Sequence, residues 1–457
     1  MTGWLSKLVA LGSVLLAAAL LVLQPDILEP KALLAAVLCI VILGLLASGI
    51  VPEILAAILF FLFAMLFAVA SPEVIFSGFY SAALWMIFGG LILAVAVRLT
   101  GLGERIARFV APRFGSSYFG IISGVVVIGV ALSFVMPATM GRVMLLTPVV
   151  LALAERFGFS EGRPGRTGMA LALGFGTFIP PFAILPANVP NIVLVGAAET
   201  LYGVVPVYGS YLLLHFPVLG ILKSLAIIIV IVALFPDRPK ATEPEALAPA
   251  DGAEVRLWVM LVLALLLWMT DFLHHVSPAW VALGVAALCM MPRLGVVTPK
   301  VFGEQVNVAP MFYVGGVMGL GALVADSGLG GLLGQYIIDV ADLQPGQDAW
   351  TFAVMTLAGT FLGPVLTNPG MPAVLTPLAG DIAQAAGLPV STILMMIVIS
   401  FSMVLLPYQA APLVVAIQMC GVRMMDALKV CLGLMALTLI VLMPINYYWW
   451  RFLGYLQ

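Results

Sequence analysis

VMPATMGRVMLLTP (residues 135–148) and PVLTNPGMPAVLTP (residues 364–377) are the two stretches of the sequence that decide the fold. Each interrupts a long apolar segment with proline, glycine and polar side chains. The spacing from the glycine of each stretch, Gly141 or Gly370, to the following threonine-proline pair is the same. Two interruptions of the same design, one in each half of the chain, predict an internal repeat.

The composition is that of a membrane protein. Of the 457 residues, 63% are hydrophobic and 9% are charged, whereas soluble domains carry roughly 45–50% apolar and about 25% charged residues. Apolar runs long enough for a membrane-crossing helix recur along the whole chain. We therefore expect an all-α polytopic membrane protein with about 11 transmembrane spans and two re-entrant helical hairpins in two inverted repeats. A β-barrel would instead show alternating segments of about 10 residues.

The distribution of positive charge predicts the orientation, because loops rich in lysine and arginine stay in the cytoplasm. We place the N-terminus inside and let each interrupted segment enter and leave on one side. Of the 19 lysines and arginines, only Lys31 and Arg451 then fall outside, while Arg142 and Lys223 lie at membrane depth. The loop 326–348, predicted to be external, carries aspartates but no lysine or arginine. We expect a multi-pass protein of the bacterial inner membrane with a cytoplasmic N-terminus.

The two halves also match outside the interruptions. WMIFGGLILAVAVRLTGLGERIA (85–107) matches MFYVGGVMGLGALVADSGLGGLLG (311–334) at the paired glycines, and each half continues into a proline-broken span, 179–196 or 405–421. Inverted repeats with broken helices are typical of secondary transporters, whose substrate and ion sites lie near the bilayer midplane. Backbone that leaves the helix there is tolerated only inside protein or beside a wet cavity. The freed helix N-termini favour anions.

In this order of hairpin and broken span, the chain resembles the divalent anion/sodium symporter (DASS) family of the ion-transporter superfamily, from about residue 32 to 454. The ending PINYYWWRFLG (444–454) is similar as well. The resemblance implies carriers of dicarboxylates, citrate and sulfate. In that family each hairpin tip carries Ser-Asn-Thr, and each broken span carries a turn like Thr-Pro-Pro-Asn.

These motifs are degenerate here. The second tip reads Thr367-Asn368-Pro369, and the first reads Ala138-Thr139-Met140, without the asparagine and the first hydroxyl. The first broken span keeps Asn191, and the second has Leu413 in its place. The resemblance implies that sodium is held by Thr367, Asn368 and Ala410 at the second tip. The sequence shows no metal-ligand cluster, so we expect no metal site and no cofactor apart from Na+.

Arg142 is the sharpest candidate, because a charge at membrane depth costs a few kcal/mol or more and is functional by default. Its guanidinium could replace the missing first cation and offer a two-pronged partner to a carboxylate. The alternative is that it caps backbone carbonyls at the tip and never contacts substrate. We expect Lys223 to snorkel to the interface. The predicted substrate-binding residues are Thr139, Arg142, Asn188, Asn191, Thr367, Asn368 and Gln409.

The resemblance also implies an elevator, in which a transport part moves against a fixed scaffold that forms a homodimer. The basic segment 98–113 is predicted to be an amphipathic arm on the inner interface. The predicted parts are scaffold and arm helices of the first repeat (1–117), the first hairpin and broken helix (118–235), a cytoplasmic linker (236–256), scaffold helices and arm of the second repeat (257–348), and the second hairpin, broken helix and last span (349–457).

We therefore expect a secondary active transporter of a small organic anion, di- or monocarboxylate-like, that is sodium-coupled with a reduced sodium stoichiometry. An anion exchanger, a proton-coupled carrier and a cation/proton antiporter are the alternatives. The acidic residues fall in loops or at span ends, which argues against a carboxylate proton relay. The sequence shows no nucleophile–base pair and no nucleotide-binding loop, so we expect neither an enzyme nor an ATP-driven pump, and no nucleic-acid partner.

Overall fold

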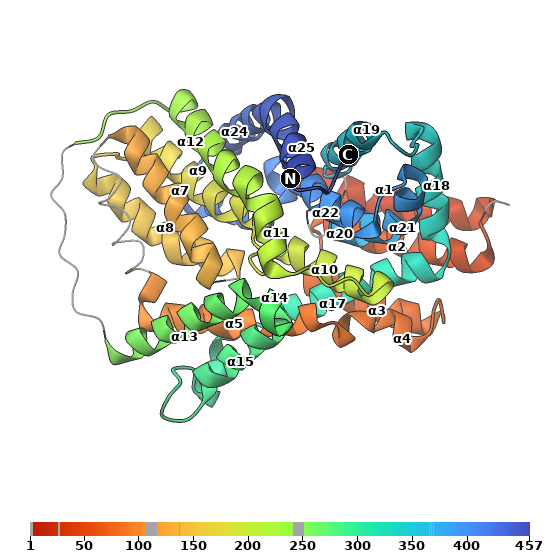
Figure 1. Cartoon of the computed structure of the whole chain (residues 1–457), viewed down its shortest axis with the longest axis horizontal. Coiled ribbons are helices and arrows are strands. Elements are labelled where there is room, and N and C mark those ends of the chain that lie inside the picture. The colour runs from red at the N-terminus through yellow and green to blue at the C-terminus, as the bar shows by residue number, and fades with distance from the viewer. Residues whose placement is uncertain are drawn as a thin grey trace.

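Every regular element in the part of the chain that the structure describes is a helix, as the composition predicts (Figure 1). The structure is a computed structural model, and it describes residues 3–25, 28–103, 105, 117–136, 138–240, 251–364, 366, 368 and 370–457. Thr367 and most of the arm predicted over 98–113 therefore lie outside the described residues. The described helices that are long and apolar enough to cross a membrane are Ala82–Thr100, Tyr118–Val135, Tyr208–Leu234, Gly252–Met269, Ala309–Asp326 and Met424–Phe452. Other apolar helices are shorter, so the span count stays a prediction.

The first half of the chain supplies one set of helices. They are α1 (Gly3–Leu23), α2 (Pro30–Ser48), α3 (Glu53–Leu66), α4 (Pro72–Ile75), η1 (Ser77–Tyr80), α5 (Ala82–Thr100), α7 (Tyr118–Val135), α8 (Thr139–Arg156), α9 (Pro164–Phe178), η3 (Pro180–Ala183), α10 (Val189–Tyr202), α11 (Tyr208–His215), the π-helical segment η4 (Phe216–Leu222) and α12 (Lys223–Leu234).

The second half supplies the corresponding set. It comprises α13 (Gly252–Met269), α14 (Asp271–His274), α15 (Pro278–Met290), α16 (Pro299–Gln305), α17 (Ala309–Asp326), α18 (Leu329–Ala341), α19 (Asp348–Leu362), α20 (Gly370–Leu375), η5 (Thr376–Leu378), α21 (Ala379–Ala386), α22 (Val390–Phe401), η6 (Pro407–Gln409), α23 (Ala411–Met419), α24 (Met424–Leu437), the π-helical η7 (Thr438–Leu442) and α25 (Met443–Phe452).

The repeats are interleaved, because helices of one repeat pack on helices of the other. Helix α5 packs against α15, and α17 packs against α3. Glycines permit this close approach: a Cβ on Gly89 would lie 2.8 Å from the Ala282 carbonyl, and one on Gly316 would lie 2.9 Å from the Ala57 Cβ. In addition, α10 packs on α20 and α22, while α23 packs on α8 and α9. The interior is therefore shared between the two halves.

Two long spans in corresponding positions contain π-helical turns. The span Tyr208–Leu234 has its π turn at Phe216–Leu222, and the span Met424–Phe452 has its π turn at Thr438–Leu442. A proline, Pro217 or Pro444, lies in or just after each turn. Since proline lacks the N–H that an α-helix needs and crowds the preceding turn, the local shift to wider hydrogen bonding has a direct cause. The similarity of the two spans extends the internal repeat to the end of each half.

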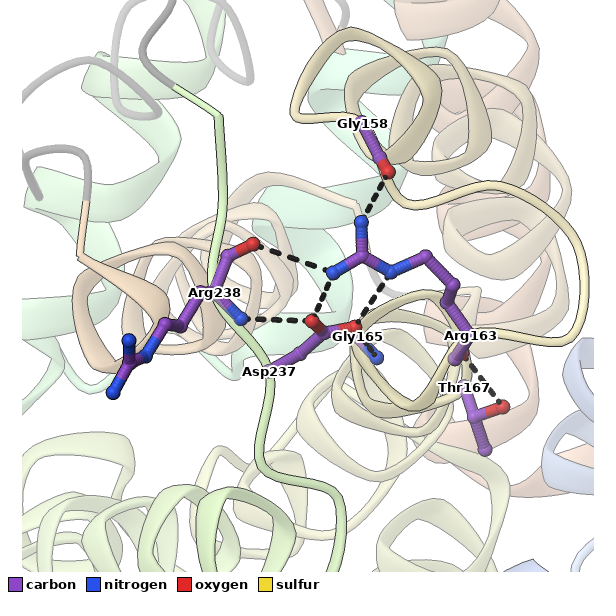
Figure 2. A network of polar contacts seen from close by, with 6 residues as sticks. All are labelled: Gly158, Arg163, Gly165, Thr167, Asp237 and Arg238. Carbon is purple, nitrogen blue, oxygen red and sulfur yellow. Dashed lines mark hydrogen bonds and ion pairs between the residues drawn. The ribbon is translucent and has the colours of Figure 1, made fainter.

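The loop between α8 and α9 is joined by hydrogen bonds to the segment that follows α12 (Figure 2). The Asp237 carboxylate accepts hydrogen bonds from the Arg163 guanidinium, from the Gly165 N–H (2.8 Å) and from the Arg238 N–H (2.8 Å). Partial burial raises the pKa of Asp237, but these hydrogen bonds and the charge of Arg163 outweigh it and hold the pKa below its ordinary value. The carboxylate thus stays ionised and joins the α8–α9 loop to the segment after α12.

Candidate functional site

The two broken spans meet at their breaks. The first break separates α9, which ends at Phe178, from α10, which begins at Val189. The second break separates α22, which ends at Phe401, from α23. The rings of Phe182, in the first break, and Phe401, at the edge of the second, have centroids 5.5 Å apart. Residues far apart in the sequence are thereby brought to one place inside the protein.

Two asparagines hold the carbonyls of these phenylalanines. Asn191 Nδ2 donates to three carbonyls of the first break, those of Pro181 (3.3 Å), Phe182 (3.1 Å) and Ile184 (2.8 Å). Asn368 Nδ2 donates to the Phe401 carbonyl (2.6 Å), and the Asn368 N–H donates to the Gln409 carbonyl (3.2 Å). Each asparagine therefore supports backbone that has left the helix, which a buried break requires.

The same hydrogen bonds leave one atom of each amide side chain without a partner. Asn188 Oδ1 caps α10 by accepting from the Asn191 N–H (3.3 Å), and Gln409 Oε1 accepts from the N–H groups of residues 405 and 406 (2.8 and 2.6 Å). The atoms left buried and unpaired are Asn188 Nδ2, Asn191 Oδ1, Asn368 Oδ1 and Gln409 Nε2. A buried unpaired polar atom costs about 1–3 kcal/mol. A polar ligand that formed hydrogen bonds with these atoms would therefore bind favourably here.

Helix polarity at the breaks favours an anion. Both α10 and α23 begin at a break, and each has a proline, Pro190 or Pro412, in its first turn. Proline suits this position because the first-turn N–H has no partner within the helix. The N-terminus of each helix carries a partial positive charge of roughly half an elementary unit. An anion beside either break would therefore be favoured by the N-terminus of a half-helix.

Arg142, at the start of α8, is fully buried and binds backbone carbonyls. Its Nη2 donates to the Thr139 hydroxyl and to the carbonyls of Thr177 and Ala187, each at 3.0 Å, and its Nη1 donates to the Met136 carbonyl. The Thr139 hydroxyl also donates to the Ala187 carbonyl (3.3 Å). Arg142 thus joins the hairpin tip to the C-terminus of α9 and to the first break. These contacts match the alternative in which Arg142 caps carbonyls, and its Nε is left buried without a partner.

Lys223 is a residue of the site that the sequence analysis missed. Its side chain does not snorkel: it is 2% exposed, and Nζ donates to the Ser402 carbonyl (2.9 Å) and lies 3.5 Å from the Ser402 hydroxyl. Ser402 follows the last residue of α22. Lys223 lies more than ten residues from either end of the span Tyr208–Leu234, or roughly 15 Å at 1.5 Å per residue. That depth, visible in the sequence, is too great for the side chain to reach the interface.

The remaining candidates are placed as follows. Ala410 is buried at the N-cap of α23, so it lies in the second break with Gln409. Gln409 is joined to Asn368 through the backbone. Thr139 is at the first tip with Arg142, and Thr367 lies outside the described residues. Among the residues that the structure describes, no group of histidine, cysteine and carboxylate side chains could hold a metal ion.

Comparison with known proteins agrees with this architecture. The sequence pattern of the sodium:sulfate symporter transmembrane region matches residues 3–456. A membrane protein of Cupriavidus necator is 26% identical over 72% of this chain and 67% of its own length. The sodium-dependent dicarboxylate transporter SdcS of Staphylococcus saprophyticus is 22% identical over 82% of this chain and 78% of its own. A citrate/succinate antiporter of Escherichia coli is 27% identical over 49% of this chain and 48% of its own length, about half of each.

A solved structure has the same fold. The YdaH transporter of Alcanivorax borkumensis superposes with a TM-score of 0.56 at 16% identity, covering 84% of this chain and 88% of its own. The expected all-helical, polytopic fold class is confirmed, and so is the expectation that the chain is a transporter rather than an enzyme. Since the family pattern covers nearly every residue, the chain belongs to the sodium:sulfate symporter (DASS) family of membrane transporters.

Proposed function

We propose that this protein is a secondary active transporter of a small organic anion with two or more carboxylates, of the dicarboxylate or citrate class. The observation that carries the proposal is the meeting of the two breaks at Phe182 and Phe401, with unpaired amide atoms on either side. Two relatives are named for such substrates: SdcS for dicarboxylates, and the antiporter for citrate and succinate.

The chemistry of the donors suits a dianion. The first break offers Asn188 Nδ2 with the N-terminus of α10, and the second offers Gln409 Nε2 with the N-terminus of α23. Each set fits one carboxylate, because helix N-termini and amide N–H groups donate to anionic oxygens. One such set in each of the two breaks favours a substrate with a carboxylate at each end. In this proposal Thr139 and Arg142 hold the carbonyls of the first break in place.

We propose alternating access of the elevator type as the mechanism. The parts 118–235 and 349–457 would carry the site past the scaffold, 1–117 and 257–348, in a homodimer of the inner membrane with cytoplasmic N-termini. One contact would have to break during this movement: the Glu199 carboxylate in α10 accepts from the Ser81 hydroxyl (3.0 Å) and the Ala82 N–H (3.2 Å) at the start of α5. In this proposal Glu199 belongs to the moving part and caps α5, a helix of the scaffold.

Two modes of coupling are open to such a carrier. Sodium symport with a single ion is favoured by the unpaired Asn368 Oδ1 at the second tip, because the Asn368 N–H binds the carbonyl of Gln409, the residue before Ala410. Thr367, the further predicted ligand, lies outside the described residues. Exchange of one anion for another is favoured by the carbonyls that Arg142 and Lys223 already bind. The first break offers no second sodium site in this proposal, because Arg142 binds its Ala187 carbonyl and Asn191 binds three of its other carbonyls.

The test is uptake into proteoliposomes of radiolabelled succinate and citrate, with labelled sulfate and acetate for comparison. We expect uptake of at least one polycarboxylate and little of acetate. Asn188→Ala and Gln409→Ala should each weaken apparent affinity by about tenfold, the effect of losing one charge-assisted hydrogen bond. Asn307→Ala, an exposed loop variant, is the matched control. Unchanged affinity in both site variants, or a preference for acetate, would contradict the proposal.

A further inference from the structure

His215, the last residue of α11, is a histidine within one of the long apolar spans. Its side chain is fully buried, and neither ring nitrogen has a hydrogen-bond partner among the described residues. It lies seven residues after Tyr208, the start of the span Tyr208–Leu234, or roughly 10 Å along the helix at 1.5 Å per residue. Ionisable side chains at such depth are rare and are functional candidates by default. The site described above leaves His215 without a role.

Other fully buried polar groups beside His215 are unpaired as well. The centroids of the His215 ring and the Trp450 ring, on α25, are 5.7 Å apart, and Trp450 Nε1 has no partner. Asn446, one turn before Trp450, has both side-chain amide atoms unpaired, and so is the Thr351 hydroxyl on α19. Thr351 precedes Phe352, whose ring centroid is 5.6 Å from that of Trp450. We call His215, Thr351, Asn446 and Trp450 the histidine cluster. Native proteins rarely leave so many buried polar groups unpaired without a use.

Tyr211 joins the histidine cluster to the first break. It lies one turn before His215 on α11, and the two ring centroids are 4.5 Å apart. The Tyr211 hydroxyl donates to the Phe182 carbonyl (2.7 Å), which Asn191 also binds (3.1 Å). Phe182 is the residue of the first break that contacts Phe401 of the second. A single side chain thus separates His215 from the backbone of the proposed substrate site.

The charged groups around His215 are bound elsewhere. The ionisable side chains on α11, on the elements packed against it and on the helices of the cluster are Tyr208, Tyr211, Glu254, Arg256, Asp271, His274, Asp348, Tyr447, Tyr448 and Arg451; η3 and η4 carry none, and Lys223 follows η4. Asp271 accepts from the Tyr208 N–H (2.6 Å), Asp348 accepts from the Gln457 N–H (2.7 Å), and Glu254 forms an ion pair with Arg105. A proton on His215 would therefore have no carboxylate partner among the described residues.

We propose that His215 is the binding site of a proton that is transported together with the substrate anion. The inference rests on the proposed function and adds a coupling ion to it. The lone pair of one ring nitrogen takes the proton from water on one side of the membrane, and the same nitrogen returns it to water on the other side. Asn446 Oδ1 and the Thr351 hydroxyl are the unpaired acceptors of the cluster. A proton needs no cavity of its own, unlike a metal ion.

The substrate supplies the missing counter-charge, which is why the two bind together. A buried charge without a partner is costly, so the empty carrier disfavours a protonated His215. A dianion at the adjacent break offsets that cost, and by linkage the proton raises the affinity for the anion by the same factor, typically about 5–150-fold. The cluster lies between the segments 118–235 and 349–457, which both belong to the proposed transport part. The proton would therefore move with the substrate and leave when the anion leaves.

The first experiment measures uptake of labelled fumarate into proteoliposomes that contain the wild-type protein, with choline in place of sodium. Fumarate is the probe because ordinary carboxyl groups titrate near pH 4, so both of its carboxylates stay ionised above about pH 6. We expect the apparent KM to fall at least about fivefold between pH 8 and pH 6. An inward proton gradient should drive accumulation that a protonophore abolishes. Uptake that responds to neither pH nor the gradient would overturn the inference while leaving the proposed substrate class intact.

The second experiment compares His215→Asn with His275→Asn, the same substitution at an exposed histidine. We expect His215→Asn to keep fumarate counterflow between vesicles at equal pH, with a KM near that of the wild type at pH 8 and independent of pH. It should show no accumulation driven by the proton gradient. His275→Asn should behave as wild type. Equal loss of counterflow in His215→Asn at every pH, with the pH dependence of KM retained, would assign His215 a purely structural role and overturn the inference.

A third measurement observes the proton directly and needs no transport. The chain has three histidines, so NMR of protein with isotope-labelled histidine rings resolves them, and the His215 signal is the one that His215→Asn lacks; if that variant cannot be purified, His215→Gln gives the assignment. At constant pH, fumarate should shift this signal toward that of a protonated ring, and an unchanged signal in the presence of bound fumarate would overturn the inference. If the wild type carries no polycarboxylate, the proposed function fails; a His215 ring that still titrates between about pH 6 and pH 8 keeps the proton site, and one that does not removes it.

Discussion

Removal of the Arg142 side chain tests whether this residue holds the first break together. Arg142→Ala leaves two buried carbonyls, those of Met136 and Thr177, without their donor, while the Ala187 carbonyl keeps only the longer hydrogen bond from Thr139. Each buried acceptor left unpaired costs about 1–3 kcal/mol. The variant no longer has to bury a charged guanidinium, so the desolvation cost that it avoids offsets part of this loss. We therefore expect a net loss of about 3 kcal/mol, similar to the cost of breaking a buried ion pair from one side.

The measurement is thermal unfolding of the purified protein in detergent at a fixed heating rate. At about 2 °C per kcal/mol, the lower end of the range for larger domains, the apparent Tm should fall by roughly 6 °C. The apparent Tm of Arg142→Lys should lie between those of the wild type and Arg142→Ala, because an ammonium keeps the charge but lacks the planar guanidinium that reaches several carbonyls. Arg238→Ala is the matched control, since its side chain is exposed and extends away from the Asp237 network (Figure 2). A Tm of Arg142→Ala within about 1 °C of wild type would refute the reasoning.

Two further predictions concern the scaffold and the linker. Gly89→Ala should lower stability by about 1–3 kcal/mol, because the new Cβ would lie 2.8 Å from the Ala282 carbonyl. Gly284→Ala is the control: nothing lies within 4 Å of its Cβ, so stability should stay the same or rise. Thermal unfolding measures both variants, and an equal loss of stability in the two would contradict the prediction. Asp237→Asn should destabilise the α8–α9 loop at neutral pH. The folded-state pKa of Asp237 is depressed, so its contribution to stability is present above the unfolded pKa of about 4 and disappears as pH falls through the folded pKa. The difference in hydrogen exchange of this loop between variant and wild type should therefore shrink only below about pH 4. A difference that already vanishes at pH 6 would contradict the stabilising role of the Asp237 carboxylate.

The breaks could be predicted from the sequence because their causes are local. Proline and glycine at fixed spacing around Gly141 and Gly370 disrupt a helix wherever it lies, and a repeated disruption indicates a repeated fold. Asn191 and Asn368 were predicted from the resemblance to the family's break and tip motifs, and the structure brings both to the contact of Phe182 with Phe401. The proline and glycine pattern therefore remains recognisable although the tip and break motifs are degenerate.

The roles of the two buried cations could not be predicted in the same way. The sequence places Arg142 at membrane depth, but its partners are backbone carbonyls of Thr177 and Ala187, and every residue type has a carbonyl. No side-chain pattern therefore reveals which way the guanidinium points. Lys223 binds a carbonyl 179 positions later in the chain, so its contact depends on how the repeats interleave rather than on any local signal.

That long separation has a consequence for how the protein is made. Arg142 finds all its described partners within the first repeat, so its guanidinium can be satisfied soon after the first broken span is synthesised. Lys223 waits for Ser402, and at about 5–20 residues per second this delay is roughly 10–40 s. During that time the ammonium, near the middle of an apolar span, has no hydrogen-bond partner among the described residues of its own half. The first half of the chain is therefore expected to need the second for stable insertion, and its expression alone should yield a product that membrane quality control removes.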